Sequence, residues 1–279
     1  MIDLTLSAFA DEYADSFDGQ LAICKELGIP CIELRFIDGK NICTVSDEVL
    51  DEVESKLKAY GMGVSAIGSP IGKIKLDGDM AEHLALAERG FAIAKRLGAK
   101  YVRIFSFYLP DGKTREECKE EVFAAMEKII RLAEKYNVIP CHENEAKIYG
   151  DTPARCRELL DYFGGELKCV FDMGNFVLEN VEPYAAYELL KKDIAYFHIK
   201  DALSAGAIVP PGKGEAKIAE ILSAHRKYAA GDFFVSLEPH LQLFSGLNAL
   251  VGRAFENPYQ YTDAKSAFAD AVEKFKELI

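Results

Sequence analysis

Four short apolar segments of the chain each end in a side chain that could bind a metal ion. The segments are Cys141-His142-Glu143-Asn144, Phe171-Asp172-Met173-Gly174-Asn175, Phe197-His198-Ile199-Lys200-Asp201 and Leu237-Glu238-Pro239-His240. The candidate ligands, three carboxylates and one imidazole, are Glu143, Asp172, His198 and Glu238. This set suits one divalent ion, with Mn²⁺ as the leading candidate and Mg²⁺, Co²⁺ and Zn²⁺ as alternatives. The pattern therefore predicts an enzyme rather than a scaffold.

Such a site predicts a particular kind of chemistry. The bound ion keeps positions open for two neighbouring substrate oxygens, such as a carbonyl and the adjacent hydroxyl, which acidifies the intervening C–H bond. A nearby carboxylate could then remove the proton. Return of the proton to the opposite face of the same carbon is epimerisation, and return of the proton to the neighbouring carbon is isomerisation. We predict a metal-dependent sugar or sugar-derivative isomerase or epimerase. A lyase or dehydratase acting on a keto-polyol such as an inosose or keto-glycoside, and a non-catalytic sugar-binding barrel, stay open as alternatives.

The composition limits the class of protein. With 279 residues, of which 49% are hydrophobic and 28% charged, the sequence can bury a large core, and we expect residues 1–279 to form a single domain. A formal charge of −12 argues against nucleic acid as a partner. No apolar stretch reaches the length of a membrane span, and the first residues do not resemble a signal peptide. We expect a soluble, cytoplasmic protein that binds a small carbohydrate and no membrane, with a homo-oligomer or a second subunit as further options.

The chain alternates apolar segments with amphipathic ones, without a low-complexity linker. The apolar segments are short and rich in β-branched and aromatic residues, which is typical of buried strands. Strands are predicted over 4–9, 31–36, 63–67, 101–105, 138–143, 169–172, 196–199 and 233–238. Helices are predicted over about 15–27, 46–60, 79–98, 114–136, 152–163, 183–192, 215–229 and 262–278. Thr114 with Glu117 indicates a capping box at a helix start, and Gly61 suits a left-handed cap at a helix end.

Eight alternating strand and helix units favour an α/β fold of the (β/α)8 TIM barrel type. An open sheet of this length usually shows a glycine-rich phosphate-binding fingerprint after its first strand, and this sequence has none there. The carboxyl ends of barrel strands meet at one rim. The four metal-capable residues end the fifth to eighth predicted strands, so we expect them to meet at one ion.

Each candidate also has a purely structural interpretation. A strand-ending carboxylate such as Asp172 often caps the helix that follows, and His198 could be a buried imidazole bonded to the backbone. Lys200 and Asp201 could form a simple salt bridge. Chance does not readily place four metal-type donors at four successive strand ends, which favours the shared site.

The other histidines and the cysteines are predicted to have structural roles. His142 should point away from Glu143 and be packed or exposed, whereas His83 and His225 lie within predicted helices and are expected on the surface. The seven cysteines lack C-x-x-C spacing, and their odd number does not suggest a disulfide framework. We expect reduced thiols that mostly fill the core.

The motifs resemble those of the xylose isomerase-like TIM-barrel superfamily, a group of sugar isomerases, epimerases and inosose dehydratases that also includes endonuclease IV. The resemblance extends from Ser7-Ala8-Phe9 to Glu238 and rests on Glu-Asn, Asp-x-Gly-Asn, His-x-Lys-Asp, Gly-x-Gly-Glu and Leu-Glu-Pro in this order. It implies a barrel whose metal ligands are Glu143, Asp172, His198 and Glu238. By similarity to ketose 3-epimerases of the group, Glu143 and Glu238 would also be the catalytic acid and base on opposite faces of the sugar.

Some positions depart from those epimerases. Asn175 stands where they carry a histidine, and an amide can bond to a hydroxyl but cannot titrate. Lys200 and Lys213 are present where an arginine is expected. Lys213 belongs to Gly212-Lys213-Gly214-Glu215, which resembles a Gly-Glu-Gly-Glu element with a basic residue at its first acidic position. The chain's five histidines and its negative charge argue against an activity like that of endonuclease IV, which binds three zinc ions through a larger histidine set.

Further polar residues near the same rim are predicted to bind substrate. They are Asn175, Lys200, Glu33, Arg35, Lys73 and His240. Lys73 could meet a carboxylate or phosphate of the substrate, or could be a solvated lysine, and His240 could bind substrate or cap its loop. The loop 202–214 and the stretch 241–261 are predicted to be lids or oligomer contacts.

Overall fold

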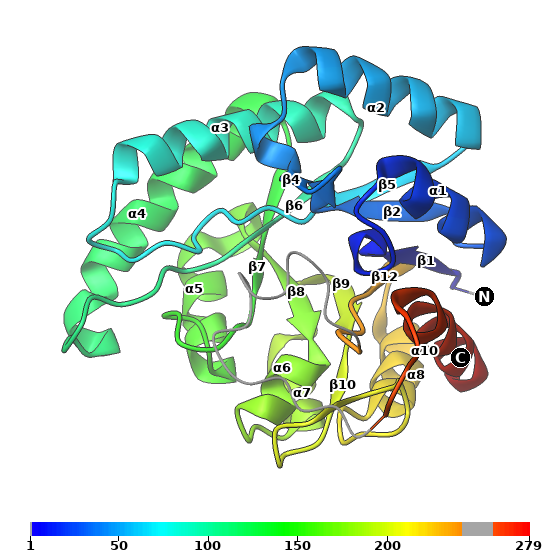
Figure 1. The fold of residues 1–279 in the computed structure, drawn as a ribbon. Coiled ribbons are helices and arrows are strands. Elements are labelled where there is room, and N and C mark those ends of the chain that lie inside the picture. The colour runs from blue at the N-terminus through cyan, green and yellow to red at the C-terminus, as the bar shows by residue number, and fades with distance from the viewer. Residues whose placement is uncertain (1, 242–258) are drawn as a thin grey trace.

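Eight parallel strands form a nearly closed barrel surrounded by helices in the computed structural model, which describes residues 2–241 and 259–279 (Figure 1). The barrel strands are β1 (Leu4–Ala8), β2 (Cys31–Leu34), β5 (Gly63–Ile67), β6 (Tyr101–Ile104), β7 (Ile139–Glu143), β8 (Lys168–Asp172), β9 (Ile194–Ile199) and β12 (Phe233–Leu237). They are hydrogen-bonded in the order β1-β12-β9-β8-β7-β6-β5-β2, and β1 and β2 lie next to each other where the barrel closes. The predicted (β/α)8 TIM barrel is confirmed.

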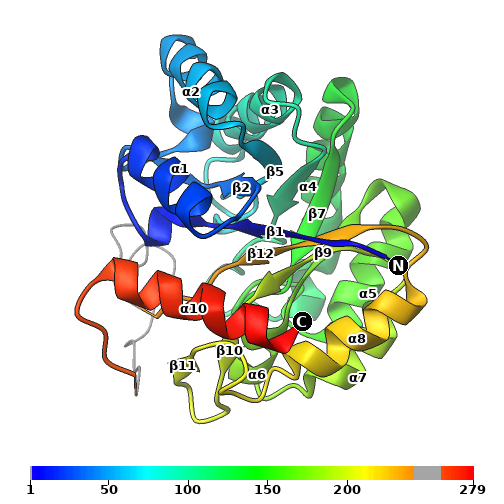
Figure 2. The ribbon, with the colours of Figure 1, turned by 90° about the vertical axis from the view of Figure 1, so that its right-hand side faces the viewer.

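Helices cover the outside of the barrel close to the predicted ranges. They are α1 (Phe17–Glu26), α2 (Asp47–Tyr60), α3 (Met80–Arg96), α4 (Arg115–Tyr136), α5 (Pro153–Phe163), α7 (Pro183–Leu190), α8 (Ile218–Tyr228) and α10 (Ala264–Leu278). Thr114 and Glu117 form the predicted capping box, and Gly61 caps α2 with φ 64° and ψ 32°. Helix α10 packs beside α1, so the two ends of the chain lie on one side of the barrel (Figure 2). None of the helices in the described ranges is long and apolar enough to span a membrane.

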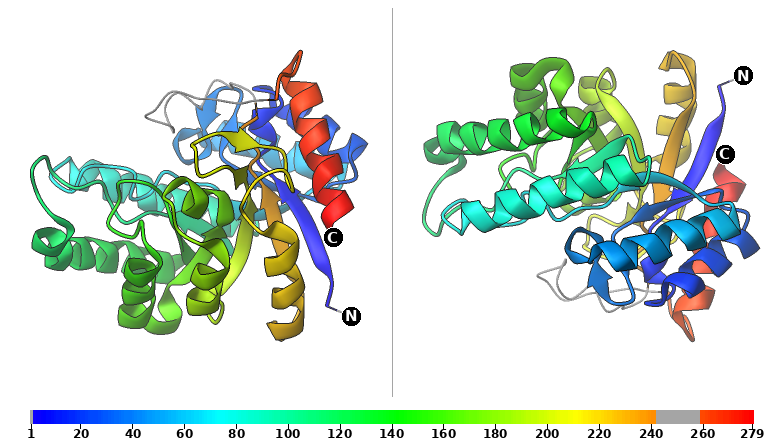
Figure 3. Two further views of the ribbon diagram at one scale, coloured as in Figure 1. Left: turned by 90° about the horizontal axis from the view of Figure 1, so that it is seen from below. Right: turned by 90° about the horizontal axis from the view of Figure 1, so that it is seen from above.

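Several short elements lie in the connections between the barrel strands and the outer helices (Figure 3). They are the hairpins β3 (Phe36–Ile37) with β4 (Lys40–Asn41) and β10 (Asp201–Ala202) with β11 (Ile208–Val209), the short helix α6 (Met173–Leu178), and 3-10 turns at Ala10–Glu12, Ile42–Thr44 and Gly164–Glu166. These elements were not predicted from the sequence, although Asp38-Gly39 is a signal for the tight turn between β3 and β4. The predicted lid 202–214 contains most of the β10–β11 hairpin. Of the stretch 241–261, residues 242–258 lie outside the described part of the chain.

The barrel interior changes from apolar to charged along its axis. Ala66, Cys141, Val170 and Tyr196 form a buried apolar cluster, and Phe234 stacks on Tyr196 with ring centroids 4.4 Å apart. Because side chains alternate along a strand, the residues two positions after Cys141, Val170 and Tyr196 also face the interior. Those residues are Glu143, Asp172 and His198. The apolar cluster therefore forms a floor beneath the predicted ligands.

Two predictions about histidines are wrong, because His83 and His225 are buried rather than on the surface. His83 Nε2 accepts a hydrogen bond from the backbone N–H of Gly72 at 2.7 Å. The His225 ring packs edge-on against Phe197 and Phe233, with centroids 4.8 Å apart in each case. Both histidines lie on the inner faces of their helices. The seven cysteines are free thiols and six are buried, in agreement with the predicted core role.

Candidate functional site

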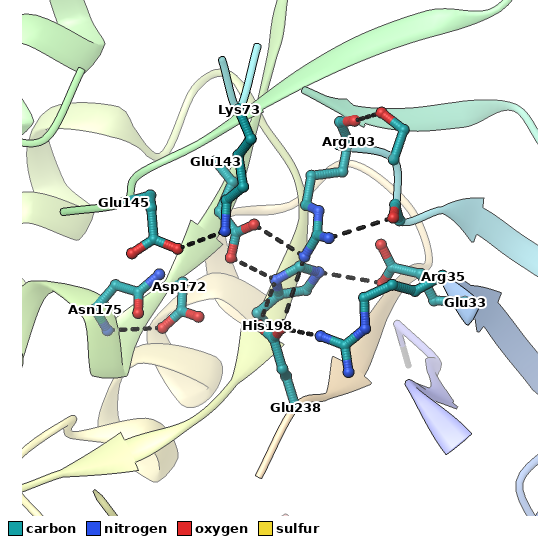
Figure 4. A network of polar contacts seen from close by, with 12 residues as sticks. Glu33, Arg35, Lys73, Arg103, Glu143, Glu145, Asp172, Asn175, His198 and Glu238 are labelled. Carbon is teal, nitrogen blue, oxygen red and sulfur yellow. Dashed lines mark hydrogen bonds and ion pairs between the residues drawn. The ribbon is translucent and has the colours of Figure 1, made fainter. Parts of the chain in front are cut away.

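The structure brings the four predicted metal ligands together inside the carboxyl end of the barrel (Figure 4). Glu143 and Asp172 end β7 and β8, and His198 is the penultimate residue of β9. Glu238 directly follows the last residue of β12. One donor atom from each residue lies within 4.8 Å of the others, and all four side chains are buried.

The donor atoms are spaced as ligands around one ion would be. His198 Nδ1 lies 2.8 Å from Glu143 Oε1 and 3.3 Å from Glu238 Oε2. Donors about 2.1 Å from an octahedral ion lie about 3 Å apart along each edge. Three carboxylates and one imidazole also match the donor chemistry of Mn²⁺, Mg²⁺ and Zn²⁺ sites. The residues present therefore fit a single divalent ion.

A further carboxylate orients the imidazole. His198 Nε2 lies 3.1 Å from Glu33 Oε2, and the other Glu33 oxygen accepts a hydrogen bond from the Tyr196 hydroxyl at 2.9 Å. A proton on Nε2 that is shared with Glu33 leaves Nδ1 facing the other predicted ligands. A carboxylate placed behind a ligating histidine fixes the ring and its tautomer. Glu33 is positioned to support His198 from behind.

Negative charge exceeds positive charge around these residues. The buried carboxylates are Asp11, Glu12, Glu33, Glu143, Asp172 and Glu238. The buried lysine and arginine side chains that face them are Arg35, Arg103 and Lys200. Among the described residues, six buried carboxyl groups thus face three permanent cations, and protons on His198 and on Glu12, whose pKa burial raises to about 8, offset part of the negative charge at neutral pH. A divalent ion would remove most of this surplus.

The surplus is reflected in the pKa values. Burial outweighs the attraction of Lys200 and raises the pKa of Asp172 to about 7. Burial also opposes a charge on Glu143, but His198 and Arg103 outweigh it and lower the pKa of Glu143 to about 2. For His198, burial is outweighed by the carboxylates around it, Glu143 first, and its pKa lies well above 6.5. Protons therefore neutralise part of the cluster, and a metal ion that displaces them would release them to solvent.

Asp172 combines the two roles that its position suggests. Its Oδ1 accepts a hydrogen bond from the Asn175 N–H at 2.8 Å and caps α6, while its Oδ2 accepts from Lys200 Nζ at 2.9 Å. Lys200 also donates to Asn175 Oδ1 at 3.1 Å and to Glu238 Oε2 at 3.2 Å. A Cβ at Gly174 would lie 2.7 to 2.9 Å from atoms of Lys200. Glycine in the Asp-Met-Gly-Asn motif thus allows the lysine to reach the site.

Comparison with known proteins decides the family. The family model for the xylose isomerase-like TIM barrel matches residues 21–251. The chain belongs to this family. It is 24% identical over 221 residues to "Probable L-ribulose-5-phosphate 3-epimerase UlaE" of Mycoplasma pneumoniae. The aligned region covers 75% of this chain and 72% of that protein.

Two solved structures show how widely this xylose isomerase-like fold is shared. The IOLI protein with a bound zinc atom has a TM-score of 0.75 at 18% identity, covering 99% of this chain and 98% of that one. The D-allulose 3-epimerase from Methylomonas sp., in complex with D-allulose, has a TM-score of 0.76 at 15% identity, covering 100% of this chain and 98% of that one. At these identities the likeness shows the fold.

Three residues of this xylose isomerase-like site were not predicted from the sequence, namely Asp11, Glu12 and Asn144. Arg35 Nε donates to Asp11 Oδ2 at 2.9 Å, and Arg35 Nη2 lies 3.4 Å from Glu12 Oε1. Asp11 and Glu12 follow the end of β1, so the strand-end rule applied to the first strand could have found them. Asn144 joins β7 to β8 through two hydrogen bonds with the backbone of Asp172, at 2.9 and 3.0 Å.

The remaining predicted substrate contacts lie on different sides of the site. Lys73 Nζ donates to Glu145 Oε2 at 3.0 Å, and its side chain is 9% exposed, so it is not a solvated lysine. Arg35 Nη1 contacts Glu238 Oε1 at 2.7 Å, on the far side from Lys200. The His240 ring lies 3.4 Å from Glu238 Oε1, and burial lowers the pKa of His240 to about 4.

His142 and Asp201 have structural roles. His142 is packed as predicted, with its Nε2 2.9 Å from Ser106 Oγ. The simple salt bridge between Lys200 and Asp201 is wrong. Asp201 instead accepts hydrogen bonds from four backbone N–H groups, because neighbouring residues at the end of β9 face different directions.

Proposed function

We propose that this xylose isomerase-like barrel is a metal-dependent isomerase or epimerase of a sugar or sugar derivative. The observation that carries the proposal is the buried set of three carboxylates and one imidazole, whose donor atoms lie within 4.8 Å of one another. The names of the M. pneumoniae relative and of the D-allulose 3-epimerase support a carbohydrate substrate. We propose Mn²⁺ as the ion, with zinc, present in the IOLI structure, as an alternative.

The proposed ligands are Glu143, Asp172, His198 and Glu238. When bound there, the ion supplies Lewis-acid activation of a carbonyl and the hydroxyl beside it. Glu143 and Glu238 are the proposed acid and base. Burial opposes their charge, but the nearby cations keep both pKa values low, so both carboxylates are ionised at neutral pH, which is the form that a general base requires. Arg103 Nη1 lies 3.2 Å from Glu143 and 3.7 Å from Glu238, and so helps to hold both in place.

The other predicted site residues divide into two groups. We propose that Lys200, Asn175, Lys73 and His240 contact substrate hydroxyls, with Lys200 placed by its hydrogen bonds to Asp172 and Asn175. Glu33 and Arg35 are positioning residues, because they act on the site through His198 and Glu238. The division predicts that variants of the first group mainly change substrate affinity, and variants of the second group mainly change metal affinity.

Metal analysis of the purified protein tests the ligand set. We expect one divalent ion per wild-type chain and a strong loss of metal in Glu143→Gln and Glu238→Gln, because each variant removes a charged ligand. Glu145→Gln is the matched control, since it removes the same charge two residues from Glu143 without changing a proposed ligand. Full occupancy in both ligand variants would overturn the assignment.

Solvent exchange tests the reaction. The metal-loaded protein is incubated in deuterated water with a panel of ketoses and keto-inositols, and the products are analysed by mass and NMR. An isomerase or epimerase incorporates deuterium without any other change in composition, whereas loss of water from the product would indicate the lyase alternative. A ligand that binds tightly but never acquires deuterium would support a sugar-binding barrel instead.

A further inference from the structure

Helices α3 and α4 lie side by side on the outside of the barrel and form the walls of an open groove (Figure 1). The groove has a volume of about 740 Å³. Its apolar lining consists of Ala81, Leu84 and Ala85 of α3 and Ala124 and Leu132 of α4. The three alanines are exposed, and small side chains allow another helix to approach closely. We refer to this surface as the α3–α4 groove.

The exposed charges of α4 along the groove are separated by sign. Residues three or four positions apart lie on the same side of a helix. The exposed residues of α4 with this spacing are, in order, Glu117, Glu121, Ala124, Lys128, Arg131 and Lys135. Both acidic residues precede Ala124, and all three basic residues follow it. This side of α4 is therefore negative in its first half and positive in its second half, with a small residue between the halves.

These charges are accessible to a second molecule. Among the residues that the structure describes, Glu121 and Lys128 form no ion pair. Arg131 contacts Glu134 and Glu166 of its own chain, but its side chain is 49% exposed. All three charged groups can therefore still interact with a partner.

The separation of charge selects the kind of partner. A partner surface of a single sign would meet like charge over half of α4, which disfavours binding. A second copy of the chain, turned by a two-fold axis near Met126, presents the reverse order of charges. The facing pairs are then Glu117 with Lys135 and Glu121 with Arg131, each formed twice. Glu127, which also lines the groove, lies beside the axis, where Lys128 of the other copy approaches it.

We propose that the α3–α4 groove is the interface of a homodimer, in which the α4 helices of two copies pack antiparallel about a two-fold axis. Each α4 lies in the groove of the other copy, so the apolar lining of both copies is covered. The interface is on the outer surface of the helices, whereas the proposed metal ligands lie inside the barrel. Dimerisation therefore goes beyond the proposed function and does not depend on which reaction the site performs.

Charge reversal at one facing pair tests the antiparallel arrangement. Analytical ultracentrifugation measures the dimer dissociation constant of wild type, Glu121→Arg and Arg131→Glu. Each variant places like charges opposite each other at both copies of the pair, so we expect its dissociation constant to rise about tenfold or more. An equimolar mixture of the two variants should recover dimers close to wild type in affinity, because the introduced arginine of one copy then faces the introduced glutamate of the other.

Glu273→Arg is the matched control, since it makes the same reversal at an exposed position of α10, on another side of the barrel (Figure 1). Its dissociation constant should stay close to that of wild type. Arg131→Glu also loses the contacts with Glu134 and Glu166, so thermal unfolding followed by circular dichroism checks that both interface variants are folded. A wild type that stays monomeric at about 0.1 mM, a dimer that neither variant weakens, or a mixture of folded variants that fails to recover dimers would overturn the proposed interface.

Discussion

Two arginines of this barrel each contact three carboxylates, one inside the barrel and one on its surface. The partners of Arg35 are Asp11, Glu12 and Glu238, and all four side chains are at most 4% exposed. The partners of Arg96 are Asp47, Asp51 and Glu54, where the arginine is 29% exposed and the carboxylates are 41 to 74% exposed. Each cluster consists of one guanidinium group and three carboxylates, so the two clusters differ mainly in how deeply they are buried.

Burial changes what such a cluster does. On the surface, water screens the charges and the pairs contribute little to stability. In the interior, each charge has lost its hydration, so the cluster is tolerable only while every partner stays in place. The interior cluster holds the Glu238 carboxylate charged beside the other proposed ligands, which a surface network cannot do. The difference suggests that the interior network is retained for the site rather than for stability.

Removal of the buried cation should have the largest effect. Arg35→Met leaves Asp11, Glu12 and Glu238 without their shared counter-ion, and we expect the free energy of unfolding at pH 7 to fall by about 3–5 kcal/mol. Urea unfolding followed by circular dichroism measures this loss. Arg35→Lys keeps the positive charge but makes fewer contacts, so its free energy of unfolding should lie between those of wild type and Arg35→Met. A loss below about 1 kcal/mol in Arg35→Met would mean that the interior cluster behaves like the surface one.

A buried histidine that has no charged partner among the described residues provides the next test. Burial lowers the pKa of His225 to about 4, whereas the unfolded value is 6.5. Between these values the unfolded chain binds a proton that the folded chain does not, so the free energy of unfolding falls as the pH falls. The total loss attributable to His225 is about 3 kcal/mol by pH 4.

Urea unfolding of wild type and His225→Phe at several pH values between 7 and 4 measures this contribution. The variant cannot titrate there, so its stability relative to wild type should rise as the pH falls through this window. Burial raises the pKa of the neighbouring Tyr187 to about 12, so that residue does not titrate in this range. A difference that does not vary with pH would contradict the buried, neutral state of His225.

Disruption of the surface cluster should have the smallest effect. Arg96→Met removes three ion pairs that solvent already screens, so we expect a urea midpoint close to that of wild type. The same measurement at low and high salt is the control, because a screened network should respond to salt more than the interior one does. A loss as large as that of Arg35→Met would remove the distinction drawn between the clusters.

Much of the site could be predicted because parallel strands impose a simple geometry. Glu143, Asp172 and His198 lie on strands whose carboxyl ends meet at one rim, so their convergence follows from their positions in the strand pattern. The partners of Lys200 and Asp201 could not be predicted in this way. The two residues are adjacent in the chain, yet Lys200 turns into the barrel while Asp201 begins the β10–β11 hairpin.

The histidines in helices show another limit. A helical pattern identifies α3 and α8, but the burial of His83 and His225 depends on which face of each helix packs against the barrel. A polar residue next to the apolar stripe of a helix can be either buried against the barrel or exposed to solvent, and the sequence pattern does not distinguish these outcomes. His83 is buried because the Gly72 N–H supplies a hydrogen bond, and that partner belongs to a separate loop.

The sequence by itself determined the alternation of strands and helices, the caps that end the helices, and the donor types at four strand ends. These features depend on residues close together in the chain. Only the tertiary structure decided which charges share one buried volume, such as Arg35 with Asp11, or Lys73 with Glu145. Coulomb attraction and desolvation depend on distance and burial in space, and separation along the chain does not set either of them.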